Sequence, residues 1–201
     1  MGMHPNGRFA ALTNYRDMSN EKERALSRGE LVVDFLKGDM IPADYLANLQ
    51  QRKNEFNGFS LLVSDGNDMH YLSNYQEDIQ EVIPGSHGLS NALLNTPWPK
   101  VQRAKSELSD YLRQTQMPEI GSLVGLLQST TAAPTELLPV TGLSPVLETS
   151  VSAQFVAVDD YYGTVNTTAV LWGHNGEVLI REVRFMSDKG ETSIQFLVKS
   201  S

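Results

Sequence analysis

The stretch HGLSNALLNTPWPKV, residues 87–101, decides the fold because it joins a strand-rich part of the chain to a helix. It gathers one His, one Ser, two Asn, one Thr and one Trp where two prolines stiffen the backbone before a helix. Pro97 and Pro99 restrict the backbone just before the helix begins. From Val101 onward, apolar residues recur at helical spacing, and they predict an amphipathic helix over residues 100–113.

Upstream of this stretch the pattern alternates between strands and helices. We expect a strand over residues 8–15, a helix after a capping box at Ser27 and Glu30 that ends at Gly38, and a helix from Pro42 to about Lys53. A hairpin over residues 59–63 and 70–73 and a short strand over 79–83 complete this part.

Downstream we expect a second helix over residues 120–128 and a packed surface loop over 129–145 that buries Leu137 and Leu138. Strands are predicted over 153–158, 164–172 and 177–185, with a last edge strand over 193–198. Asn175-Gly176 is typical of a type I′ hairpin turn. Paired helices between antiparallel strands favour a layered α+β sandwich over a Rossmann-type alternation.

Composition narrows the classes of partner. The 201 residues carry a net charge of −8, which disfavours nucleic acid and anionic membranes. The chain has no cysteine, so it contains no disulfide, thiolate metal site or thiol nucleophile. Its apolar runs are too short to span a bilayer, and its first residues do not resemble a signal peptide. We therefore expect small molecules or proteins as partners, and a cytoplasmic location.

Few residues carry a recognisable chemical motif. Gly88-Leu-Ser90 resembles part of a nucleophile elbow, but the final glycine is missing, which favours an ordinary loop hydroxyl. The amides of Asn91 and Asn95 can face a ligand and Trp98 can wall a pocket; equally, the asparagines can cap turns while Trp98 fills the core. Two interpretations also apply to Asn14-Tyr-Arg-Asp17, which can be a functional loop or can hold a plain surface Arg–Asp pair. No metal site is predicted.

Taken together, several blocks resemble one known family. They are Arg8-Phe-Ala-Ala-Leu-Thr-Asn-Tyr-Arg-Asp17, Ser27-Arg-Gly-Glu-Leu-Val32, Asn57-Gly-Phe59, Tyr71-Leu-Ser-Asn74, residues 87–101 and Tyr162-Gly-Thr164. In this order they resemble the transport and Golgi organisation protein 2 family, also called the NRDE family. The resemblance covers about residues 7–184 of what we expect to be a single domain over residues 1–201.

This resemblance implies an N-terminal-nucleophile-hydrolase-like fold, a four-layer sandwich of helices, antiparallel sheet, antiparallel sheet and helices. Family members begin with Met-Cys and carry an early Asn-Arg-Asp-Glu motif, and both are absent here, so we expect an N-terminally incomplete domain without its front strands. By resemblance, Asn14 and Asn91 stand where oxyanion-side asparagines belong. Val165 stands where the family usually has Arg, and a valine cannot bind a carboxylate or phosphate as that Arg can.

The family is linked to intracellular handling of haem, so the resemblance implies haem or another hydrophobic small molecule as cargo, together with acceptor proteins. No resident cofactor and no catalytic residue are predicted. The candidate ligand-binding residues are Asn14, Arg16, Asp17, His87, Ser90, Asn91, Trp98 and Thr164. His87 is the candidate axial ligand for haem iron, against a structural, hydrogen-bonding role. The alternatives are an amide hydrolase that is active only in a form carrying the cysteine, and an interaction scaffold without a pocket.

Overall fold

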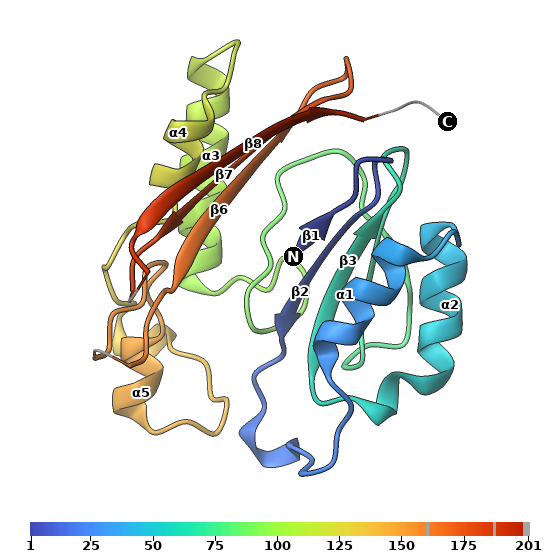
Figure 1. Ribbon diagram of the computed structural model, residues 1–201. Coiled ribbons are helices and arrows are strands. Elements are labelled where there is room, and N and C mark those ends of the chain that lie inside the picture. Colours follow the sequence, from blue (N-terminus) through green and yellow to red (C-terminus); the bar gives the residue numbers. More distant parts are fainter. Residues whose placement is uncertain (160, 187, 199–201) are drawn as a thin grey trace. The chain divides into compact units, whose positions relative to one another are not determined.

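The computed structural model describes residues 1–159, 161–186 and 188–198, and it divides into two compact units, Met1–Thr96 and Pro97–Val198 (Figure 1). Each unit combines an antiparallel sheet with helices, which confirms the α+β class predicted from the sequence. No helix in the described ranges is long and apolar enough to cross a membrane.

The first unit is built on a five-stranded antiparallel sheet in which the strands follow their order in the chain. The strands are β1 (Gly2–Met3), β2 (Phe9–Asn14), β3 (Phe59–Ser64), β4 (Met69–Ser73) and β5 (Gln80–Glu81). The helices α1 (Arg28–Lys37) and α2 (Pro42–Arg52) lie on one face of this sheet (Figure 1). Short 3-10 helices cover Met18–Asn20 and Lys53–Glu55.

The core of the first unit lies between this sheet and the two helices. Because β2 pairs with β3 so that Ala10 faces Val63 and Leu12 faces Leu61, alternate residues point to the same side. The buried cluster on that side comprises Ala10, Leu31, Val32, Phe35, Leu46, Leu49, Phe56, Phe59, Leu61, Val63 and Leu72. Burial of each large apolar side chain contributes roughly 1.5–3 kcal/mol. The strand residues that alternate with these core positions therefore face the side of the sheet away from the helices.

The second unit is built on a three-stranded antiparallel sheet of β6 (Asn166–Trp172), β7 (Glu177–Arg184) and β8 (Gly190–Leu197). Its helices are α3 (Pro99–Gln114), α4 (Ile120–Gly125) and α5 (Pro145–Ser150), with a 3-10 turn over Thr135–Leu137. α4 packs on β6 and β7, and Figure 1 shows α3 and α4 on the same face of the sheet. The edge strand predicted over residues 193–198 is confirmed, and it forms part of β8.

One predicted strand, over residues 153–158, does not form. Ala157 makes only an isolated bridge with Gly163, and the Phe155 amide donates to the Ser129 carbonyl at 2.9 Å. The segment turns back on itself instead, because the Val158 and Asp159 amides both donate to the Tyr162 carbonyl. The apolar residues of this segment fit a strand, but its backbone amides form the hydrogen bonds of the local turn instead of pairing with a neighbouring strand.

Three finer predictions are also wrong. The Ser27 side chain makes no capping hydrogen bond at the start of α1, and Leu137 is 57% exposed. The β6–β7 turn is not type I′, which requires positive φ at both central residues, because Gly176 has φ of 80° and Asn175 has no positive φ. The turn is longer, closed by the Gly173 amide on the Glu177 carbonyl at 2.8 Å.

Candidate functional site

Residues 87–96, here called the polar loop, are fixed to the first-unit sheet by a chain of hydrogen bonds. Ser60 of β3 and Tyr71 of β4 are both fully buried and lie on the sheet face opposite the core. The Leu94 amide donates to Tyr71 Oη at 3.1 Å, and Ser60 Oγ donates to the Ala92 carbonyl at 3.0 Å. Ser60 Oγ and Tyr71 Oη are 3.0 Å apart.

The direction of this chain follows from the number of protons. Ser60 has one hydroxyl proton, and the Ala92 carbonyl can only accept, so that proton is committed. Tyr71 must therefore donate to Ser60 Oγ while its own oxygen accepts from the Leu94 amide. Every member of the chain is satisfied, which makes it an anchor for an irregular segment rather than a reactive pair.

His87 has both ring nitrogens engaged within the protein. Nε2 lies 2.8 Å from the Ile83 carbonyl oxygen and Nδ1 lies 3.0 Å from Asn95 Nδ2. The carbonyl can only accept, so Nε2 donates and Nδ1 accepts. Asn95, at φ of 62°, also accepts from the Gly88 amide through Oδ1 at 3.0 Å. This arrangement favours the structural, hydrogen-bonding role of His87 over iron ligation.

Asn91 joins the polar loop to the end of β2. Its Nδ2 donates to the Asn14 carbonyl at 3.0 Å, and its Oδ1 accepts from Arg16 Nη2 at 3.1 Å. The Arg16 amide in turn donates to the Asn91 carbonyl at 2.8 Å. The structure thus brings together three of the predicted ligand-binding residues, Asn14, Arg16 and Asn91. The Asn91 side-chain amide, however, already forms hydrogen bonds within the protein.

Asp17 organises the turn that follows β2. Its carboxylate accepts from the Ser19 amide at 3.1 Å, from the Ser19 hydroxyl, from the Asn20 amide group and from Tyr75 Oη at 2.9 Å. These hydrogen bonds, from Ser19 first, lower the pKa of Asp17 from 3.8 to about 2. Burial, followed by Asp17, raises the pKa of Tyr75 to about 12. Tyr75 also stacks on Tyr15 with ring centroids 3.8 Å apart, so Asp17 is part of a rigid turn.

Neither nucleophilic nor metal chemistry is assembled in this region. Within the described ranges, no hydrogen bond ties the Ser90 hydroxyl to a histidine or a carboxylate, which catalysis by an elbow serine requires. The same part of the chain holds no group of three His, Asp or Glu side chains suited to a metal ion.

Trp98 and Thr164 belong to the second unit. Trp98 is half-buried at the N-cap of α3, and the Lys100 ammonium lies 5.7 Å from its ring centroid. Thr164 accepts from the Val156 amide through Oγ1 at 2.9 Å and donates its own amide to the Val156 carbonyl at 2.8 Å. The two residues have different surroundings, because Thr164 lines a pocket and Trp98 is not among the residues that line it.

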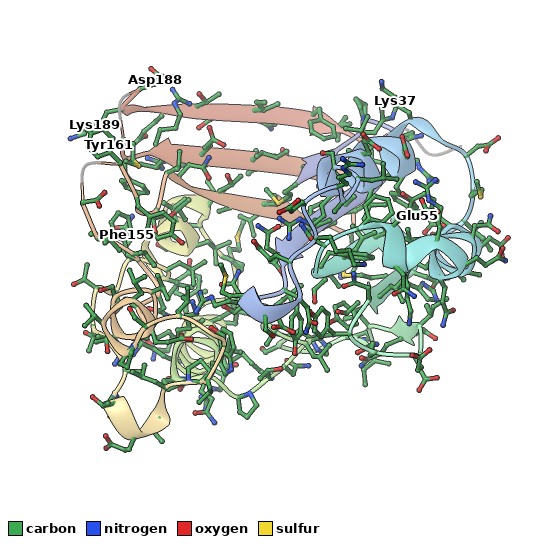
Figure 2. All side chains as sticks on the ribbon, turned by 90° about the horizontal axis from the view of Figure 1, so that it is seen from below. Lys37, Glu55, Phe155, Tyr161, Asp188 and Lys189 are labelled. Atoms are coloured by element: carbon green, nitrogen blue, oxygen red, sulfur yellow. The ribbon has the colours of Figure 1, made fainter. Side chains whose placement is uncertain are left out.

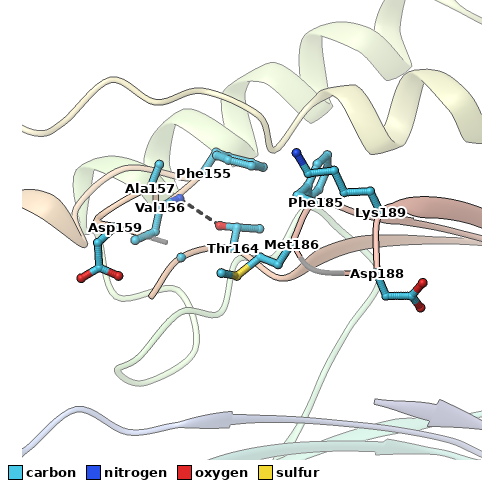
Figure 3. Close-up of a pocket in the computed structure, with 10 residues that line it drawn as sticks. Phe155, Val156, Ala157, Asp159, Thr164, Phe185, Met186, Asp188 and Lys189 are labelled. Atoms are coloured by element: carbon cyan, nitrogen blue, oxygen red, sulfur yellow. Dashed lines mark hydrogen bonds between the residues drawn. The ribbon is translucent and has the colours of Figure 1, made fainter. Parts of the chain in front are cut away.

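The pocket beside Thr164, here called the aromatic pocket, has a volume of about 660 Å³ (Figure 3). Phe155 and Phe185 meet edge to face in its wall, with ring centroids 4.9 Å apart at 82°. The other lining residues are Val156, Ala157, Asp159, Gly163, Thr164, Met186, Asp188 and Lys189. Gly163 is required here, because an added Cβ would lie 2.9 Å from the Val156 carbonyl oxygen.

Charged residues lie at the edges of the aromatic pocket. Figure 2 shows Phe155, Tyr161, Asp188 and Lys189 at one end of the second-unit sheet. Asp188 pairs with Arg184 at 3.4 Å, and Asp159 accepts from the Tyr161 and Tyr162 amides at 2.7 Å each. Lys189 extends back over Phe185 toward Phe155 (Figure 3), and no described residue forms a hydrogen bond or ion pair with its ammonium. Within the described ranges, the Lys189 ammonium therefore has no polar partner.

Sequence reasoning identified Thr164 but missed Phe155, Phe185, Met186 and Lys189. Phe155 and Phe185 were assigned to strands, and nothing in their spacing indicates that they meet. The available signal was the position of Met186 and Lys189 just after a predicted strand, in a connecting segment of the kind that often carries ligand-binding side chains.

Comparison with known proteins gives a consistent family. The model of the Transport and Golgi organisation 2 family matches residues 1–187, a range that contains the predicted 7–184. The chain is 32% identical to the Transport and Golgi organization 2 homolog of Mus musculus, over 94% of this chain and 72% of the relative. It is 34% identical to the Transport and Golgi organization protein 2 homolog of Homo sapiens with the same coverage, and 33% identical to that of Bos taurus over 90% of this chain and 70% of the relative.

Proposed function

We infer that this chain, which belongs to the Transport and Golgi organisation 2 family, binds a hydrophobic small molecule in the aromatic pocket, with haem as the cargo that the family resemblance favours. The observation that carries this proposal is the coincidence, in one pocket of about 660 Å³, of two aromatic rings, a thioether and an ammonium group that no described residue binds. A pocket of that volume lies within the range of small-molecule sites, about 300–1,000 Å³.

Each of these groups matches a different part of an amphiphilic ligand. Phe155 and Phe185 offer apolar contact to a flat ring system. The Met186 thioether is a soft donor of the kind that binds haem iron in cytochromes. The Lys189 ammonium can pair with a carboxylate such as a haem propionate. The proposal therefore assigns iron contact to Met186, since the ring nitrogens of His87 already have partners.

The hydrolase alternative has less support in these residues. The 201 residues contain no cysteine, no described histidine or carboxylate is hydrogen-bonded to the Ser90 hydroxyl, and the Asn91 amide donates to the Asn14 carbonyl. The scaffold alternative requires that no small molecule bind, and the following experiment decides between it and cargo binding.

Haem and an iron-free porphyrin are titrated into the full chain, with haem followed by its Soret band and porphyrin by its fluorescence. Met186→Leu keeps the side-chain volume and removes the sulfur, so we expect at least tenfold weaker haem binding or a shifted Soret band, with porphyrin affinity unchanged within twofold. Phe185→Ala should weaken both ligands. Lys189→Gln should weaken both by a smaller factor, because an exposed ion pair contributes only about 0.2–1 kcal/mol.

Met69→Leu is the matched control, because Met69 is a half-buried methionine on β4 outside the aromatic pocket. It should leave both titrations unchanged. If neither ligand binds saturably, or if Phe185→Ala and Met186→Leu bind both ligands like the unaltered chain, the aromatic pocket is not the cargo site. In the first of these cases the scaffold alternative is favoured.

A further inference from the structure

A second pocket lies in the first unit and is unrelated to the aromatic pocket. It has a volume of about 230 Å³ and is lined from α1, from α2 and from the residues that join them. Leu31, Met40 and Leu49 give it apolar walls, whereas Asp34 and Arg52 are exposed charges that also line it. Arg8, which directly precedes β2, also lines this cavity, and we call it the Arg8 pocket.

Arg8 is the unusual member of this set. Only 6% of its surface is exposed, its Nε donates to the Phe35 carbonyl at 2.9 Å, and its guanidinium lies 3.9 Å from the centroid of the Phe35 ring. Its Nη2 is buried and has no acceptor among the described residues. Within the same residues, no carboxylate lies within 4.0 Å of the guanidinium.

A buried cation without an ion pair is rare, because removal of a charge from water is unfavourable unless an anion or hydrogen bonds compensate. Burial lowers the pKa of Arg8, and the more distant carboxylates of Asp65 and Asp39 act in the opposite direction. The Phe35 contacts hold the guanidinium in one orientation, so Nη2 is a fixed, buried donor on a residue that lines the cavity. A fixed, desolvated guanidinium recognises a carboxylate or a phosphate.

We propose that the Arg8 pocket binds a small organic monocarboxylate, with its carboxylate on Arg8 and its apolar body against Leu31, Met40 and Leu49. One feature favours this class over a phosphate: the walls are largely apolar, which suits an alkyl group. The volume limits the ligand to a few carbon atoms.

The test uses butyrate as the probe and butyramide as its uncharged counterpart. Either ligand is titrated into the full chain at constant ionic strength, and the NMR signals of the Arg8 Nε–H group and the Met40 methyl group are followed. We expect saturable shifts with butyrate and at least tenfold weaker binding of butyramide. Arg8→Gln should weaken butyrate binding at least tenfold, as read from the Met40 signal.

Because Arg8→Gln also disturbs the contact with Phe35, a second variant fills the pocket from its exposed side. Met40 and Met18 are 44% and 46% exposed, and Met18 lies outside the pocket, so Met40→Trp and Met18→Trp form a matched pair. Only Met40→Trp should weaken binding tenfold, as read from the Arg8 signal. Absence of saturable butyrate binding, equal affinity for butyramide, tighter binding of methyl phosphate, or an unaffected Met40→Trp variant would each overturn the proposal.

Discussion

Replacing Tyr71 with Phe tests whether the polar loop is held by the hydrogen-bond chain through Ser60. Tyr71 is fully buried, and the substitution removes one oxygen while it leaves the ring in place. The loss strands the Leu94 amide and removes the proton that Ser60 Oγ accepts. A buried donor left without a partner costs about 1–3 kcal/mol.

We therefore expect the free energy of unfolding of the first unit to fall by about 2 kcal/mol, which is roughly a 30-fold change in its equilibrium constant. Urea denaturation measures the fall, and the midpoint should move while the slope stays constant. Hydrogen exchange gives a local measurement, because the Leu94 amide should lose protection more than the amides of β3. Tyr161→Phe is the control. Tyr161 is 94% exposed, so removal of its hydroxyl group should change the free energy of unfolding by less than about 0.5 kcal/mol.

A double-mutant cycle with Ser60→Ala tests the hydrogen bond between Ser60 and Tyr71. Because the two changes share this bond, their effects should fall short of additivity by about 1 kcal/mol. Strictly additive effects would contradict that bond. A Tyr71→Phe variant of unchanged stability, with a protected Leu94 amide, would refute the anchoring role of the chain altogether.

Three further predictions concern other positions. The pKa of Asp17 in the folded protein is about 2, below its ordinary 3.8, so its carboxylate stabilises the fold above about pH 4. That contribution is lost as the pH falls to about 2. In acid titration, the free energy of unfolding of Asp17→Asn should therefore depend less on pH across this range. Gly58→Ala should destabilise by about 1–3 kcal/mol, because its Cβ would lie 3.0 Å from a backbone oxygen, whereas Gly125→Ala meets nothing within 4 Å and should be neutral or stabilising in thermal melts. Thr164→Val should cost about 1–3 kcal/mol by stranding the Val156 amide, and Thr164→Ser should restore most of the loss in the same melts.

Local patterns predicted most of the regular elements because their causes are local. The hairpin of β3 and β4 follows from apolar runs around a turn, and α2 begins at Pro42 as predicted. The helix α5 was missed although its signal is present. Ser144 precedes Pro145 at the first helical position and accepts from the Leu147 amide, but the Thr- and Pro-rich surroundings favoured a loop.

The site was harder to predict because its contacts join distant parts of the chain. Asn91 bonds to Asn14, 77 residues away, and to Arg16, 75 residues away. The sequence shows that these side chains can bind a ligand but not whether other parts of the protein already occupy them. Burial of Arg8 beside a cavity is equally invisible, because an arginine at the start of a strand is usually exposed.

The polar loop illustrates why polar richness is ambiguous. An irregular segment packed on a sheet has no strand or helix partners, so its backbone groups need side-chain partners. Asn95, Ser60 and Tyr71 supply them, whereas Asn91 bonds to the end of β2 and His87 holds Asn95. Substitutions in this group should therefore lower the stability of the first unit. Only variants such as Met186→Leu, whose side chain lines the aromatic pocket and has no hydrogen bond to lose, can separate a lost cargo site from a loosened fold.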